Sequence, residues 1–110
     1  MDHSLADDKE NYTFDPFARH AFYHTINQSL VRTAVERFVA RQPEQRQVCV
    51  VELASGTGLV TEIIFQELQR QGRSVSMTCI EPSSEARALA REQLHDRDVQ
   101  FVDGDAAHMA

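Results

Sequence analysis

The sequence lacks the features of several protein classes. It has no apolar run long enough to span a membrane, and its amino terminus is too polar and acidic for a secretory or transit signal. It has 11 basic against 17 acidic residues, a net charge of -6, which disfavours binding to nucleic-acid phosphates. Its two cysteines, Cys49 and Cys79, form no CxxC pair and have no metal-ligand spacing, so we expect buried, reduced thiols. These absences predict a cytoplasmic protein with no membrane, nucleic-acid or metal partner.

The overall composition is that of a small soluble domain. The chain has 110 residues, of which 42% are hydrophobic and 25% charged, enough for one modest core. Residues 1–14 are polar with little to bury, so we expect a flexible tail there, followed by a single structural unit over 15–110. Apolar residues such as Leu30, Val35 and Phe38 recur at helical spacing and predict a long helix over 17–40.

After Pro43 the sequence alternates between strand-like and helix-like segments. Strands are predicted over 48–53 and 74–81, and a third strand that runs into a turn over 99–106; helices are predicted over 59–71 and 82–96, with Gly72 as the cap that ends the first of these helices. This order is the first half of a doubly wound α/β sheet, so the predicted fold class is a partial, Rossmann-like three-layer sandwich with about three parallel strands. Right-handed crossovers place the strands in the order 3-2-1, with the first at an open edge. Its continuous apolar run, VCVVEL, predicts burial on both faces.

The turn ASGTG, residues 54–58, follows the first strand and opens a helix. Gly56 and Gly58 allow a sharp bend and close approach of a ligand, while the helix start attracts a carboxylate or phosphate. Glu52, just before the turn, would repel a pyrophosphate and attract an ammonium or sulfonium group. Glu81 follows Gly58 at close to the spacing of about 20 residues at which an acid binds ribose hydroxyls. Thr61 stands where the dinucleotide fingerprint has a third glycine, so the pattern favours S-adenosylmethionine.

Three segments, VVELASGTG, CIEPS and VQFVDGDA, resemble in order and spacing the cofactor motifs of class I S-adenosylmethionine-dependent methyltransferases. The resemblance spans residues 48–109. It implies that S-adenosylmethionine is the cofactor and S-adenosylhomocysteine its product. The implied cofactor-binding residues are Glu52, Ala54, Ser55, Gly56, Thr57 and Gly58 for the methionine end, Glu81 for the ribose, and Asp105 with Ala106 for the adenine; Pro82 is counted among the cofactor-binding residues without a role of its own. Ala54 departs from the pattern, since many members have glycine there.

The resemblance also implies that the complete fold has further strands, which normally carry the acceptor pocket and any catalytic base. We therefore expect the amino-terminal half of a methyltransferase domain with a small-molecule acceptor, and no turnover by the 110-residue chain alone. No catalytic residue can be named. The open edge predicts either a homodimer or completion by a carboxyl-terminal half. Two alternatives remain: a dinucleotide-binding domain, and a non-catalytic interaction module derived from a truncated methyltransferase.

Overall fold

The computed structural model describes residues 16–104, with side chains from residue 21 onward. The elements follow one another as predicted: α2 (Pro16–Arg41), β1 (Gln47–Leu53), α3 (Leu59–Arg70), β2 (Ser74–Ile80), α4 (Ser84–Gln93) and β3 (Val99–Val102). Gly72 has φ 75° after α3, where its amide donates to the Gln69 carbonyl, which confirms it as the residue that ends this helix. The predicted ends of most elements differ from the observed ones by one to three residues.

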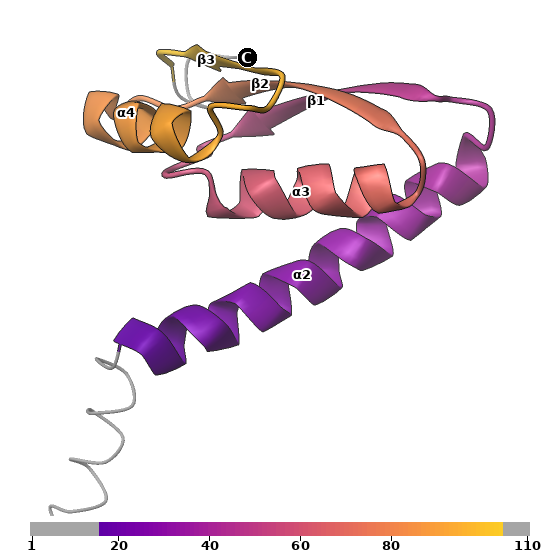
Figure 1. Cartoon of the computed structure of the whole chain (residues 1–110), viewed down its shortest axis with the longest axis horizontal. Helices are drawn as coiled ribbons and strands as arrows, with labels where there is room; N and C mark the ends of the chain where they lie inside the picture. The colour runs from indigo at the N-terminus through magenta and orange to yellow at the C-terminus, as the bar shows by residue number, and fades with distance from the viewer. Residues whose placement is uncertain (1–15, 105–110) are drawn as a thin grey trace, which may run out of the picture.

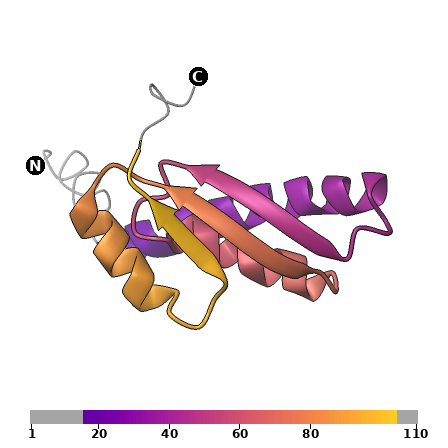
Figure 2. The same ribbon diagram turned by 90° about the horizontal axis from the view of Figure 1, so that it is seen from above.

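The three strands are parallel and lie in the order β1-β2-β3. β1 is therefore an edge strand, as the right-handed crossovers predicted. The register pairs Leu53 with Ile80 and Ile80 with Val102, so the three carboxyl ends meet at one end of the sheet. The helices lie below one face (Figure 1). From above, α2 follows the β1 side of the sheet and α4 the β3 side (Figure 2).

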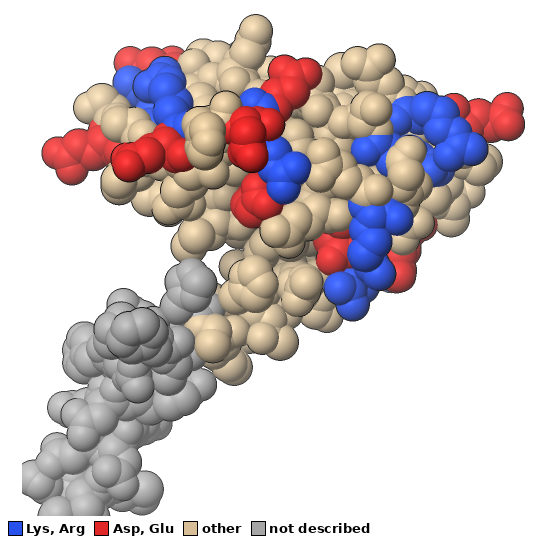
Figure 3. Space-filling model, viewed as in Figure 1, with Lys and Arg blue, Asp and Glu red and all other residues tan. Residues whose placement is uncertain are grey.

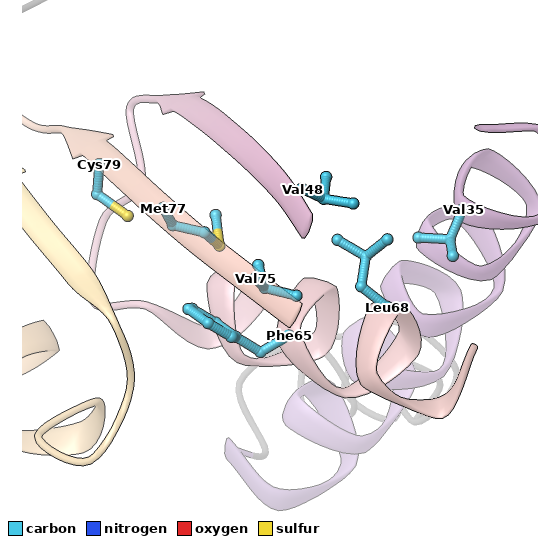
Figure 4. Close-up of a cluster of buried hydrophobic side chains, with 7 residues drawn as sticks. All are labelled: Val35, Val48, Phe65, Leu68, Val75, Met77 and Cys79. Carbon is cyan, nitrogen blue, oxygen red and sulfur yellow. The ribbon is translucent and has the colours of Figure 1, made fainter. Parts of the chain in front are cut away.

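The core fills the space between this face and the helices. Phe65 and Met77 are almost fully buried at its centre, where α3 meets β2. Figure 4 shows the whole cluster: Val35, Val48, Phe65, Leu68, Val75, Met77 and Cys79. All of its strand residues have the same side-chain direction, because alternate residues of a strand share a face. The core thus fixes which face of each strand the helices cover.

A buried carboxylate fastens α2 to α3. Glu67 is 3% exposed, and its two oxygens accept hydrogen bonds from Arg32 at 3.2 and 3.1 Å and from Arg70 at 2.7 Å. The hydrogen bonds from Arg32 lower the pKa of Glu67 most, so this carboxylate stays ionised. Beyond this contact the amino-terminal half of α2 extends past α3 (Figure 1). Residues 21–31 carry no Lys, Arg, Asp or Glu, and this part of α2 is tan in Figure 3.

Two expectations about β1 are wrong. The strand is covered on one face only, and Val51 and Leu53 on its other face are 65% and 49% exposed. Cys49 shares that face and is exposed, whereas Cys79 is buried as expected. The reason is that all helices in the described part of the chain lie on the same side of the sheet. The apolar run was interpreted correctly as a strand, but it does not show what covers each face.

Candidate functional site

The turn between β1 and α3 has an unusual backbone conformation. Ala54, Gly56 and Gly58 all have positive φ, at 55°, 61° and 92°. Glycine is needed at position 58 for a second reason: a Cβ there would lie 2.9 Å from Cδ1 of Leu94, the residue that caps the end of α4. A Cβ at position 56 would meet nothing within 4 Å, so the space beside Gly56 is open. The turn is therefore packed tightly against α4 at one end and accessible near its middle.

Glu81 joins this turn to the next loop. Its Oε1 accepts the Gly56 N–H at 2.7 Å, and its Oε2 accepts the Ser83 N–H at 3.0 Å. Arg87 donates to the Glu81 carbonyl at 2.6 Å and holds the backbone at this point. The two backbone amides, that of Ser83 first, lower the pKa of the Glu81 carboxyl. A carboxylate has about four acceptor positions, so Glu81 can bind further hydroxyl groups without giving up either amide.

Glu52 has a different environment. Its Oε1 accepts hydrogen bonds from the Thr61 hydroxyl and, at 3.7 Å, from the Cys79 thiol. Thr61 and Cys79 are both fully buried, and their side-chain oxygen and sulfur lie 3.8 Å apart. Burial raises the pKa of Glu52, although these two hydrogen bonds oppose the rise. Both interactions go to one oxygen, so the other remains available for a cationic group from outside.

The start of α3 provides donors for an anionic group. Gly58 occupies the N-cap position and has no side chain with which to accept from the first amides of the helix. Those amides and the helix dipole favour a negative charge nearby. The Ser55 hydroxyl is also buried here; it makes no hydrogen bond of good geometry within residues 16–104, although it lies near enough to the Cys79 thiol to interact electrostatically. The turn thus leads into a helix start that favours an anion, and it lies between two acids, Glu52 and Glu81.

The structure brings most of the predicted site residues together. Those that lie at the carboxyl end of the sheet, in the segments after β1 and β2, are Ala54, Ser55, Gly56, Thr57, Gly58, Glu81 and Pro82, with Glu52 just before the first turn. Asp105 and Ala106 lie outside the described residues, so their predicted contact with the adenine stays a prediction. β3 ends at Val102, within the segment predicted as a strand that runs into a turn.

Three contributors to this site were not predicted. Thr61 was noted only as a missing third glycine, yet it supplies the hydrogen bond that orients Glu52. Cys79 was assigned to the core, which is correct, but it also contacts the same carboxylate. Arg87 supports Glu81 from the first half of α4. A sequence signal exists for Thr61, because a hydroxyl in the first turn of the helix lies close to the end of the preceding strand.

Other kinds of site are not evident in the part of the chain that the structure describes. Residues 16–104 contain no group of three or more His, Cys, Asp or Glu side chains placed to hold a metal ion. None of the described helices combines the length and the apolar character needed to cross a bilayer.

Comparison with solved structures identifies the fold. A Listeria monocytogenes protein assigned to the class I S-adenosylmethionine-dependent methyltransferases matches 70% of this chain with a TM-score of 0.59 and 15% identity. The chain has part of the fold of a class I methyltransferase. The DszA carbon methyltransferase matches 87% of the chain with a TM-score of 0.53 and 24% identity. No protein-family model matches the sequence, and no curated protein does either.

The methyltransferase fold is represented here only in part. The matched region covers 25% of the Listeria protein and 26% of the DszA carbon methyltransferase. The chain therefore spans about a quarter of the length of each. Its three strands and their helices are the part that carries the turn and the two acids described above, whereas the larger share of either methyltransferase has no counterpart in these residues.

Proposed function

We propose that this chain binds S-adenosylmethionine and forms the cofactor-binding part of an enzyme that methylates a small-molecule acceptor. The observation that carries the proposal is the arrangement of Glu52 and Glu81 at the ends of adjoining strands, with the Gly56 amide bonded to Glu81 between them. A ligand that spans both acids needs a cation near Glu52 and hydroxyls near Glu81. S-adenosylmethionine has both, together with a carboxylate for the start of α3.

Each residue would have a distinct role. Glu81 would accept the ribose hydroxyls through its unused acceptor positions, and the Gly56 amide keeps its carboxylate in place. Glu52, oriented by Thr61, would face the ammonium group of the methionine end. Asp105 and Ala106 would contact the adenine. The bound cofactor supplies an already activated methyl group, so the residues of this chain have to position the donor rather than perform acid–base chemistry.

The acceptor site would lie largely outside these residues. The net charge of -6 makes a nucleic-acid acceptor unfavourable, which supports a small molecule. Since the acceptor site would lie elsewhere, we expect the 110-residue chain to bind S-adenosylhomocysteine but to show no methyl transfer by itself. Turnover of candidate acceptors with labelled S-adenosylmethionine would contradict this second expectation and leave the first intact.

Calorimetric titration with S-adenosylhomocysteine tests the cofactor assignment. Glu81→Ala removes a charged hydrogen-bond acceptor and should weaken binding by about tenfold or more. Glu92→Ala is the matched control, because Glu92 is an exposed acid on α4. Circular dichroism should first confirm that each variant is folded. If the folded wild-type chain does not bind, or if both variants bind as the wild type does, the proposal is wrong.

A dinucleotide is the second candidate ligand, because the turn and Glu81 would also suit a pyrophosphate and its ribose. Glu52 argues against it, since one of its oxygens remains available beside the turn and would repel the pyrophosphate when ionised. Competition titrations with NAD distinguish the two. Tighter binding of NAD than of S-adenosylhomocysteine would reverse the order of the two candidates.

A further inference from the structure

Two acids lie opposite each other where β2 and β3 end. The last strand pair is Ile80 with Val102, and the Glu81 N–H donates to the Val102 carbonyl at 2.9 Å, so the register continues one residue beyond it. Glu81, in the loop after β2, therefore lies beside Asp103, in the loop after β3. Like charges in directly opposed positions repel, so this end of the sheet favours a cation close to both residues.

Arg87 of α4 supplies this cation. Its Nη1 donates to the Glu81 carbonyl at 2.6 Å and lies 3.4 Å from Oδ1 of Asp103, so one nitrogen contacts both loops. The side chain of Arg87 is 14% exposed, whereas that of Asp103 is 75% exposed. The arginine is thus largely enclosed, and only its ion pair with Asp103 lies at the surface. An enclosed guanidinium is costly without such partners, which defines where it lies.

The start of α4 fixes the position of Arg87. Ser83, the N-cap residue, donates its N–H to the Glu81 carboxylate, and its carbonyl accepts the Arg87 N–H at 3.0 Å. One turn further along the helix, Arg91 lies over the Phe101 ring of β3, with its guanidinium carbon 5.3 Å from the ring centre. α4 lies on the β3 side of the sheet (Figure 2). The two arginines of this helix therefore have separate contacts, and only Arg87 joins the loops.

We propose that Arg87 is a positioning residue for the adenosine part of the cofactor, because it holds the loop after β2 against the loop after β3. In the proposed function, on which this role rests, Glu81 would bind the ribose and Asp105, two residues after Asp103, would contact the adenine. A single bond joins ribose to adenine, so the distance between them varies little. A ligand that contacts both loops binds most tightly when they are already held together.

Calorimetric titration of three variants with S-adenosylhomocysteine tests this role. Arg87→Met keeps the length of the side chain but removes its charge and its donors, and should weaken binding about tenfold. Arg87→Lys should bind within about threefold of the wild type, because one nitrogen makes both contacts and an ammonium group can replace it. A side chain that only filled space would not distinguish Met from Lys.

Arg91→Met is the matched control, since it removes an arginine of the same helix whose contact is with Phe101, and it should bind as the wild type does. Circular dichroism first establishes that each variant is folded. If Arg87→Lys loses as much affinity as Arg87→Met, or if Arg87→Met loses no more than Arg91→Met, Arg87 does not have this role.

Hydrogen exchange tests the link between the loops without a ligand. The Glu81 amide, bonded to the Val102 carbonyl, should exchange about tenfold faster in Arg87→Met than in the wild type, and at an unchanged rate in Arg91→Met. This difference in a wild-type chain that does not bind S-adenosylhomocysteine would contradict the proposed function and support the link. Binding by the wild type, with equal exchange in both variants, would contradict the link and support the proposed function.

Asp103→Asn applies even if Arg87→Met fails to fold, because Asp103 is exposed. It removes the charge that pairs with Arg87 and should weaken the binding of S-adenosylhomocysteine about threefold. Asp98→Asn is its control, since Asp98 is an exposed acid that directly precedes β3. Equal affinities for these two variants would overturn the role of the ion pair in positioning the loops.

Discussion

β1 and β2 are neighbouring strands of seven residues each, but they differ in composition and in exposure to solvent. On the face that no described helix covers, β2 carries Ser76 and Thr78, whereas β1 carries Cys49 and Val51 beside them. The more apolar strand is thus the more exposed one. In an isolated sheet the edge strand would be expected to be the more polar, so β1 has the composition of a strand with a neighbour on each side.

The acids at the ends of these two strands, Glu52 and Glu81, also differ in their hydrogen-bond partners and in the direction of their pKa shifts. Glu81 accepts two backbone amides, which lower its pKa and keep it ionised. Glu52 has a hydroxyl and a thiol as partners, and burial raises its pKa. One carboxylate is already stabilised by the protein, while the other remains insufficiently stabilised until a cation approaches. The two acids should therefore respond differently to pH and to ligand.

Replacing one side chain of each strand with alanine should give the largest difference in the free energy of unfolding. Met77→Ala, at the centre of β2, leaves a cavity in the core and should lower the free energy of unfolding by about 2–5 kcal/mol. Val51→Ala removes a mostly exposed side chain and should change it by about 0.5 kcal/mol or less in the monomer. Urea denaturation at a concentration low enough to exclude dimers measures both. Similar losses for the two variants would show that β1 is covered in the monomer.

The affinity for S-adenosylhomocysteine should depend on pH through Glu52. The ligand's ammonium group needs the ionised carboxylate, so affinity should fall as the pH falls through the raised pKa of Glu52. The limiting slope is about tenfold per pH unit. Glu81 stays ionised in this range because its pKa is lowered, so it adds no pH dependence there. Titrations of the wild type and of Glu52→Gln should give a sloping and a flat profile; two profiles of equal slope would exclude Glu52.

Substitutions in the turn after β1 should have small, graded effects. Ala54 has a φ of 55°, which favours glycine, so Ala54→Gly should stabilise the chain by about 0.5 kcal/mol once the greater flexibility of unfolded glycine is included. Gly56→Ala would place a side chain on a residue with positive φ, although its Cβ would meet no other atom. It should lower the free energy of unfolding by about 1 kcal/mol. Gly58→Ala should cost more, because its Cβ would contact Leu94. Thermal denaturation gives the order, and a destabilised Ala54→Gly variant would contradict it.

The sequence was sufficient to predict the order of the elements and the position of β1 at an edge, because apolar periodicity and right-handed crossovers are local or general rules. It also predicted which acids lie beside the turn. It could not show that one face of β1 is uncovered, since the exposure of Cys49 depends on where every helix lies. The contact between Thr61 and Glu52 was missed because Thr61 was interpreted only as the absent third glycine, although its place in the first turn of α3 brings its hydroxyl close to the end of β1.

α2 is held through its carboxyl-terminal half, by the Arg32–Glu67 ion pair and by Val35 in the core, which makes the rest of the helix a lever. At about 1.5 Å per residue, the segment from Arg32 back to Pro16 is an arm of about 24 Å. A tilt of about 5° at the Arg32–Glu67 ion pair would displace the far end by about 2 Å, roughly half a helical turn. A small force applied near the amino-terminal end of α2 would therefore exert a large torque on the buried ion pair, because torque grows with the length of the arm.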